Sequence, residues 1–414
     1  MKRLLSVTAF TAILTLIKMV CGFIVSKVVA IYAGPSGVAM LGQLQSMVTS
    51  LNGIANSAVN TPVVRYTAEN KELNLCSPWW RASLTWAVIL LSILSLLGVV
   101  FASEISILLF SNDKYYWLVL TCICSLPLTA IGTLFNSIVN GFEQYRKFIY
   151  RGMLSVIVST SLIVLMIINY GLPGALLTIS IQTGIIGFII FFLSLREPWF
   201  KVNIWFGSVK KEKMKGVGGY IIMAIVSAMV VQVSLIVIRN DIISHVGWEE
   251  AGNWQAVRKI SDVYLGVITT ALSAYFLPKL SSLKNADSII SEVNRTALVI
   301  VPIAASLALF IYLFRDFAIS LLFTSEFNSA RNLFAFQLIG DVVKMTSWLY
   351  AYPMLSRGAT KWFVGSEVVF SATFVILSSI AIDLAGVKGV NMAYLINYLL
   401  YFTFVFFNVK KFCR

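Results

Sequence analysis

The chain contains few charged residues and only one histidine. Charged residues make up 12% of its 414 residues, whereas a soluble domain carries about a quarter. The single His245 excludes a histidine-rich metal site. Five cysteines, an odd number without a Cys-x-x-Cys motif, act mostly as small hydrophobes in apolar runs. A Gly-x4-Gly-Lys-Ser/Thr loop is also missing, which excludes ATP hydrolysis of the P-loop type.

Apolar residues dominate what remains. They make up 58% of the chain, the mean hydropathy is +0.86, and apolar runs of about 20 residues recur throughout, as in membrane-spanning helices. Alternating strands of about 10 residues, typical of membrane barrels, do not occur. The first apolar run has no small-residue cleavage site after it, so we expect a retained span. We predict about twelve spans, at 4–31, 37–65, 82–103, 117–140, 149–170, 174–195, 216–243, 252–279, 295–314, 329–355, 362–383 and 388–408.

Three short motifs recur half a chain apart. Ile105–Ser111 resembles Ala318–Thr324 at an offset of 213 residues, and Gly171–Ala175 resembles Gly386–Val390 at 215. Arg146 faces Lys361, again at 215. Such a common offset indicates two copies of one unit, and an even number of spans per copy makes the copies parallel. We therefore predict an all-α polytopic protein with an N-lobe (1–195), a basic linker (196–215) and a C-lobe (216–414).

The net charge of +14 follows from topology. Most lysines and arginines fall at one end of the spans, in alternate loops and in the linker, which by the positive-inside rule places both termini and the linker in the cytoplasm. The basic residues therefore indicate orientation in a membrane, and we expect no nucleic-acid partner.

Two lysines lie inside the first predicted span. An ionisable group in the bilayer costs at least about 2.5–3.5 kcal/mol, so it usually faces protein or water. Lys18 is in mid-span, and its own span contains no acidic residue. We expect it to line a central cavity and bind an anionic group, the alternative being a structural ion pair. Lys27 points to the opposite side of that helix and is nearer its end, where it can also snorkel to the surface.

Charged residues also occur inside the C-terminal half. Arg258 and Asp262 are spaced i,i+4, and Asp341 and Lys344 are spaced i,i+3, so each pair shares a helix face. Either pair can neutralise itself, or its aspartate can exchange H⁺ or Na⁺ during a transport cycle. Arg239 faces the cavity or anchors its span at the interface beside Asp241.

Several motifs of this half resemble those of Wzx-type flippases, including the O-antigen and lipid III flippases. They are Ile260–Tyr264, Phe276–Leu280, Phe314–Ala318 and Phe334–Lys344, and Ala33–Gly37 in the first half also agrees. The resemblance covers essentially the whole chain. It implies a V-shaped, two-lobe, MATE-like bundle of the multidrug and polysaccharide exporter superfamily, in a bacterial inner membrane, that moves an undecaprenyl-pyrophosphate-linked oligosaccharide to the outer leaflet. An O-antigen polymerase and a chain-length regulator are the protein partners that it implies.

By that family's architecture, the first, second, seventh and eighth spans line the cavity. This favours Lys18, Lys27, Arg239, Arg258 and Asp262 over Asp341 and Lys344, since Lys and Arg in a low-dielectric cavity attract a diphosphate strongly. The glycan needs polar and aromatic contacts, for which the candidates are Gln43, Gln45, Asn52, Asn56 and Trp254.

Three functions are compared. The first is the glycolipid flippase, for an O-antigen unit or alternatively lipid III, without covalent chemistry or a cofactor beyond possible H⁺ or Na⁺ coupling. The second is an exporter of drugs or cations, which calls for an acidic cavity, whereas the first-half spans contain Lys18 and Lys27. The third is a membrane glycosyltransferase or polymerase, which calls for a large charged outer loop that this chain lacks. We expect a flippase and not an enzyme.

Overall fold

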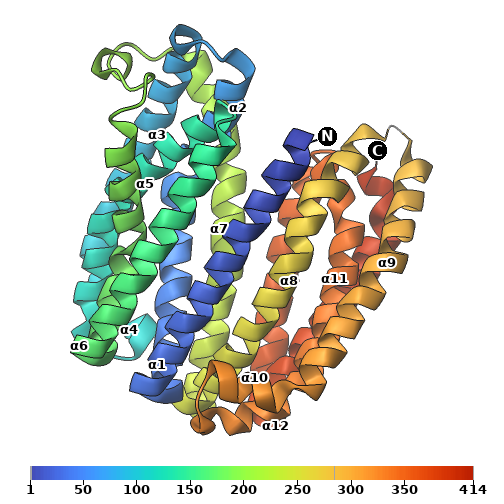
Figure 1. The fold of residues 1–414 in the computed structure, drawn as a ribbon. Coiled ribbons are helices and arrows are strands. Elements are labelled where there is room, and N and C mark those ends of the chain that lie inside the picture. Colours follow the sequence, from blue (N-terminus) through green and yellow to red (C-terminus); the bar gives the residue numbers. More distant parts are fainter. Residues whose placement is uncertain (1, 284, 414) are drawn as a thin grey trace. The chain divides into compact units, whose positions relative to one another are not determined.

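The computed structural model describes residues 2–283 and 285–413, which form helices joined by short loops and contain no strand, and it describes no side chain of residues 2–12, 271, 273–275, 277 or 278 (Figure 1). The helices are α1 (Lys2–Asn56), α2 (Thr61–Asn70), α3 (Leu73–Val100), α4 (Ala102–Phe110), α5 (Tyr116–Gly141), α6 (Tyr145–Ser194), α7 (Lys211–Val246), α8 (Trp248–Ser282), α9 (Ala286–Leu313), α10 (Arg315–Leu322), α11 (Phe334–Ser356) and α12 (Thr360–Phe412). Short 3-10 helices are η1 (Asp113–Tyr115), η2 (Val202–Ile204) and η3 (Ser325–Leu333).

The three longest helices, α1, α6 and α12, each consist of two arms. Each is interrupted by a glycine with positive φ: Gly34 at 60°, Gly171 at 61° and Gly386 at 58°, a conformation that glycine adopts without steric cost. The two arms of α6 fold back on each other, as shown by the hydrogen bond that Gln182 Nε2 donates to Ser159 Oγ at 3.3 Å. In a straight helix these two residues would lie about 35 Å apart.

With the arms counted separately, the described residues contain twelve helices long enough to cross a membrane. Seven helical segments are also apolar enough to do so, and three of these contain the two-armed helices α1, α6 and α12. The remaining two long helices are α8 and α11, which carry several charged side chains in their interiors. The prediction of an all-α protein with about twelve spans is confirmed.

The repeat found in the sequence has a structural counterpart. Helix α3, of 28 residues, is followed by the 9-residue α4, and 213 residues later the 28-residue α9 is followed by the 8-residue α10. Gly171 and Gly386, predicted as equivalent, have nearly the same backbone angles, with ψ of −148° and −146°. Gly247, which separates α7 from α8, repeats the positive φ of Gly34 at an offset of 213.

The chain forms two compact units, each described by itself. The first comprises residues 1–28 and 43–233, and the second comprises residues 29–42 and 234–414. The chain passes from one unit to the other within α1 and within α7. In the first unit α5 packs against α6, α2 and α3, and in the second α11 packs against α12, α9 and α8. In these units the linker and the first part of α7 belong to the first unit, and the division into an N-lobe (1–195), a linker (196–215) and a C-lobe (216–414) stays a prediction.

The linker is folded onto the first unit. Glu197 accepts from Arg151 Nη2 at 2.8 Å and from Lys147 Nζ at 2.9 Å. Trp199 packs in an aromatic cluster, its ring centre 6.2 Å from that of Trp80. Arg151 is itself buried, so its guanidinium and the Glu197 carboxylate compensate each other away from water. The segment that begins the linker is thus fixed to the ends of α3 and α6.

Glycines allow α5 and α6 to pack with their backbones in contact. A Cβ on Gly187 would collide with the Leu128 carbonyl, and one on Gly132 would collide with the Gly187 backbone. We expect Gly187→Ala to destabilise the folded protein by about 1–3 kcal/mol, the usual cost of overpacking. Thermal unfolding of the detergent-solubilised protein would measure this. Gly219→Ala, in α7, is the matched control, because nothing lies within 4 Å of its Cβ position. Equal melting temperatures for the two variants would contradict the close approach.

Candidate functional site

The second unit contains a fully buried carboxylate. Asp341, on α11, is 0% exposed and accepts three hydrogen bonds from neutral donors. Tyr264 Oη on α8 donates at 2.9 Å, Gln337 Nε2 on α11 at 3.1 Å, and Tyr394 Oη on α12 at 2.8 Å. Hydrogen bonds to a charged group are stronger than neutral ones, and together they offset part of the cost of burial. The carboxylate therefore joins three helices.

Lys344 lies one turn along α11 but makes no ion pair with Asp341 in the part of the chain that the structure describes. Its ammonium instead lies among three aromatic rings, 5.0 Å from the ring centre of Trp348, 5.7 Å from Tyr394 and 5.4 Å from Tyr398. Such rings stabilise a cation through their quadrupoles. Tyr394 therefore lies beside both charged groups, with its hydroxyl on the carboxylate and its ring near the ammonium.

Two guanidinium groups flank one indole ring in the same unit. The Cζ atoms of Arg239 on α7 and Arg258 on α8 lie 5.7 Å and 5.6 Å from the ring centre of Trp254. Arg239 is 1% exposed, and its Nη2 donates to Gln255 Oε1 at 2.8 Å. The arrangement brings two positive charges close together and holds them with π-faces and an amide, which is costly unless an anion compensates them.

Asp262 supplies part of that compensation. Its Oδ2 lies 3.7 Å from Arg258 Nε, and its side chain is 51% exposed whereas that of Arg258 is 18% exposed. The i,i+4 spacing thus forms the expected pair. At this distance, and with half of the carboxylate exposed, the pair is loose enough for Arg258 to exchange partners.

The predicted basic residues of the first span lie in the other compact unit. Lys18 is exposed on α1 in the middle of an apolar segment, and among the described residues it forms no hydrogen bond or ion pair. Lys27 is half-buried, and Gln43 is fully buried on the second arm of α1. Lys18 and Arg239 belong to different compact units, and their meeting in one cavity stays a prediction.

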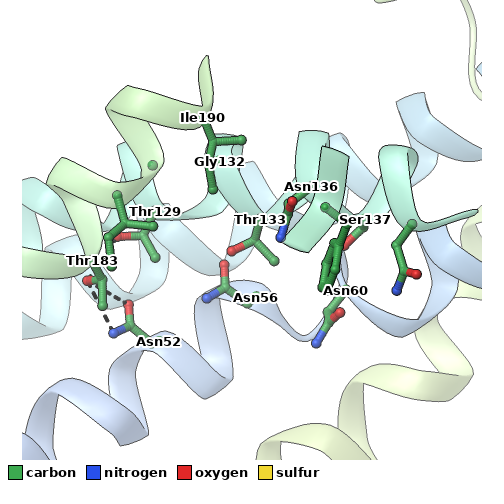
Figure 2. A pocket seen from close by; sticks show the side chains of 14 residues that line it. Asn52, Asn56, Asn60, Thr129, Gly132, Thr133, Asn136, Ser137, Thr183 and Ile190 are labelled. Carbon is green, nitrogen blue, oxygen red and sulfur yellow. Dashed lines mark hydrogen bonds between the residues drawn. The ribbon is translucent and has the colours of Figure 1, made fainter. Parts of the chain in front are cut away.

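The first unit contains a polar pocket of 370 Å³ that includes the predicted residue Asn56. In Figure 2, Asn52, Asn56 and Asn60 lie on one side, facing Thr133 and Asn136 of α5 on the other. The complete lining is Asn52, Asn56, Asn60, Thr129, Gly132, Thr133, Asn136, Ser137, Asn140, Phe148, Thr183, Ile186, Gly187 and Ile190.

Sequence reasoning missed several of these groups. Gln337 could have been found, because it lies one turn before Asp341 on the same helix face. The stripe Thr129, Thr133, Asn136, Asn140 also has helical spacing within an apolar span. Tyr394 and Gln255 carried no comparable signal. The described residues contain no group of three or more histidine, cysteine, aspartate or glutamate side chains able to hold a metal ion.

The amino-acid sequence is similar to those of two curated proteins. The lipid III flippases of Escherichia coli (strain K12) and Shigella flexneri are each 28% identical to the chain over 408 residues, which cover 95% of this chain and 95% of theirs. The chain resembles lipid III flippases along nearly its whole length. The resemblance predicted from its motifs is thereby confirmed. No protein-family model matches the chain.

Solved structures agree on the fold. An inward-facing multidrug-resistance MATE transporter of the MOP superfamily superposes with a TM-score of 0.75 at 13% identity, covering 97% of this chain and 98% of its own. A MOP-superfamily transporter from Pyrococcus furiosus, whose binding pocket is described as reversed in polarity, gives 0.64 at 14% identity, with 99% and 96% covered. The chain is therefore a multi-pass membrane protein with the MATE-like fold, and the relatives named here are flippases and transporters.

Proposed function

We propose that the chain is a flippase that moves an undecaprenyl-pyrophosphate-linked oligosaccharide from the cytoplasmic to the periplasmic leaflet of a bacterial inner membrane. The observation that carries the proposal is the pair of guanidiniums around Trp254, in a chain that resembles lipid III flippases over 95% of its length. The cargo is an O-antigen repeat unit or the lipid III of enterobacterial common antigen. The lipid tail stays in the bilayer and needs no closed pocket.

The diphosphate is bound by cationic side chains. Arg239 and Arg258 supply forked donors that match phosphate oxygens, and Lys18 and Lys27 of the first span add point charges. Arg258 leaves Asp262 for the diphosphate, which is the stronger anionic partner. Trp254 holds the guanidiniums, while Gln43 and Asn56 serve the glycan.

Transport proceeds by alternating access coupled to an H⁺ or Na⁺ gradient. The two compact units act as the moving bodies, joined through α1 and α7. Asp341 is the principal candidate for the coupling group, because a buried carboxylate with three neutral donors can lose its charge or change partners without leaving a bare ion. Lys344 and Asp262 complete the candidates.

Topology and partners follow from the same proposal. Both termini and the linker are cytoplasmic by the distribution of basic residues. The delivered lipid-linked unit is the substrate of an O-antigen polymerase working with a chain-length regulator, with which this protein would interact in the membrane. Fusing the C-terminus to a reporter that is active on only one side of the membrane would test the orientation.

Deleting the gene in its host tests the function. Loss of the O-antigen ladder on a lipopolysaccharide gel, restored by a plasmid copy, assigns the O-antigen unit, whereas loss of common antigen alone on a blot assigns lipid III. If both remain intact, the flippase proposal fails.

We expect plasmid-borne Arg258→Ala to restore neither product, because a charge-assisted hydrogen bond to the diphosphate is lost. Arg258→Lys keeps the charge but not the fork, and should restore export partly. Arg331→Ala is the control, since Arg331 is exposed and pairs with Asp316 outside the cluster. Normal export by Arg258→Ala at normal protein level would remove Arg258 from the site.

A further inference from the structure

The pocket of the first unit is polar but uncharged. Nine of its fourteen lining residues are asparagine, threonine or serine, and none carries a charge. Five are asparagines, each able to donate and accept at once. Polar residues inside an apolar membrane bundle are costly and tend to mark a ligand pathway. This pocket therefore needs an explanation separate from the cationic groups that bind a diphosphate.

Two of its amides are incompletely satisfied. The carbonyl oxygens of Asn56 and Asn136 are buried and have no hydrogen-bond partner among the described residues. Leaving a buried acceptor without a partner costs about 1–3 kcal/mol, so a ligand that donates here gains more than it would from a satisfied site. In Figure 2 these two side chains project from opposite walls into the same space.

A network of hydrogen bonds lies at one end of the pocket. Asn52 Nδ2 donates to Thr183 Oγ1 at 3.3 Å, and Thr129 Oγ1 lies 3.1 Å from the same Thr183 oxygen. The dashed contacts in Figure 2 mark the first of these pairs. At the opposite end are Asn60 and Asn140, where α1 stops and where α5 ends before α6. This is the end to which the linker is anchored, and it is cytoplasmic in the proposed topology.

The volume of the pocket and its apolar lining residues limit the kinds of ligand that it can bind. The volume of 370 Å³ is many times the roughly 30 Å³ occupied by one water molecule, and it lies within the range of small-molecule sites. A bare monovalent cation would not fill it. Phe148, Ile186 and Ile190 provide apolar surface beside the amides. A sugar ring presents the same combination, with hydroxyls on its rim and C–H groups on its faces.

We propose that this pocket recognises a neutral sugar residue of the lipid-linked glycan. Asn56 and Asn136 accept from sugar hydroxyls or an N-acetyl N–H, while Thr133 and Asn60 exchange hydrogen bonds with neighbouring hydroxyls. Phe148 packs on a ring face. The inference rests on the proposed flippase function and assigns the sugar to the first unit, separately from the arginines of the second.

Binding to two lipids separates the sugar from the diphosphate. The purified protein, in nanodiscs, is titrated with undecaprenyl pyrophosphate and with the same lipid carrying one neutral N-acetylhexosamine. We expect the wild type to bind the glycosylated lipid more tightly. In Asn136→Leu this form should bind about tenfold more weakly, the loss of one or two hydrogen bonds, with binding of the bare lipid unchanged. Asn169→Leu is the control, because Asn169 is exposed on α6 and bonds only to its own helix at Leu165.

Thr133→Val guards against a folding defect in Asn136→Leu. It keeps the side-chain volume, removes only a hydroxyl and should reduce the same preference. If the wild type binds both lipids equally, or if the variants weaken both equally, the sugar site is overturned. If the preference survives but the variants alter the Na⁺ dependence of binding, the pocket is a cation site and the inference is again overturned. If the wild type binds neither lipid, it is the flippase function that fails.

Discussion

Replacing Asp341 with asparagine is expected to uncouple transport from the cation gradient while leaving the protein folded. Asparagine has nearly the same shape, and its amide can still bond to Tyr264, Gln337 and Tyr394. The substitution removes only the charge, and with it the group that binds H⁺ or Na⁺.

The size of the effect follows from the energy that one coupled charge delivers. Moving one elementary charge through 100 mV supplies about 2.3 kcal/mol, equivalent to about fiftyfold in the distribution of substrate between leaflets. Proteoliposomes loaded with the glycosylated lipid, with and without an imposed H⁺ or Na⁺ gradient, would measure it. Wild-type transport should respond to one of these gradients, and Asp341→Asn to neither.

Asp316→Asn is the matched control. Asp316 is 58% exposed on α10 and pairs with Arg331, so losing its charge should leave the gradient response intact. An unchanged response in Asp341→Asn would make the carboxylate a structural junction of α8, α11 and α12. In that case Asp262, the more exposed member of its pair with Arg258, becomes the next candidate for the group that couples transport to the cation gradient.

The architecture was largely readable from the sequence because it is encoded locally. Apolar runs of spanning length set the twelve helices, and a glycine within a run marks where α6 and α12 turn back. Gly171 and Gly386 share an offset with other motifs, and they share backbone angles in the structure for the same reason, a turn that only glycine enters cheaply. The compact units were less predictable, since no composition change marks residues 28, 42 or 233.

The site was predictable only where its members share a helix. The spacing of Arg258 and Asp262 gave their pair directly. For Asp341 and Lys344 the same spacing suggested an ion pair. In the structure the Asp341 carboxylate instead accepts hydrogen bonds from tyrosines, and the Lys344 ammonium lies near aromatic rings. Tyr394 lies 53 residues beyond Asp341, on a different helix. Only the packing of α12 against α11 brings it there, and spacing along the chain contains no trace of that contact.

The sequence led to the prediction of some polar residues of the pocket and not of others. Asn56 was selected because it lies on a span expected to line the cavity, whereas Asn136 lies on α5, which that expectation left out. The pocket is lined mostly by α5 and α6, and the spans expected to line the cavity contribute only Asn52, Asn56 and Asn60 of its fourteen lining residues. The helical spacing of polar residues on α5 was the available sequence signal for this pocket. That these residues face a pocket depends on how α1 and α6 pack around α5.

The other large effect on export is expected from replacing Lys18. Its charge is unfavourable inside a membrane, and it has no partner among the described residues. It is exposed within an apolar span of α1 and has no partner among the described residues, which disfavours a structural ion pair. Removing such a charge should make membrane insertion easier by about 2.5–3.5 kcal/mol. A residue kept only for stability would not be a lysine at this position.

Lys18→Ala is therefore expected to abolish glycolipid export while the protein level and melting temperature stay equal or rise. Complementation of the deletion strain, read on the lipopolysaccharide gel and the common-antigen blot, measures export, and a quantitative blot of the membrane fraction measures the protein. Lys18→Arg should retain export, since it keeps the charge. Lys147→Ala is the control, because Glu197 remains paired with Arg151 without it. Normal export by Lys18→Ala at a normal protein level would remove Lys18 from the proposed diphosphate site.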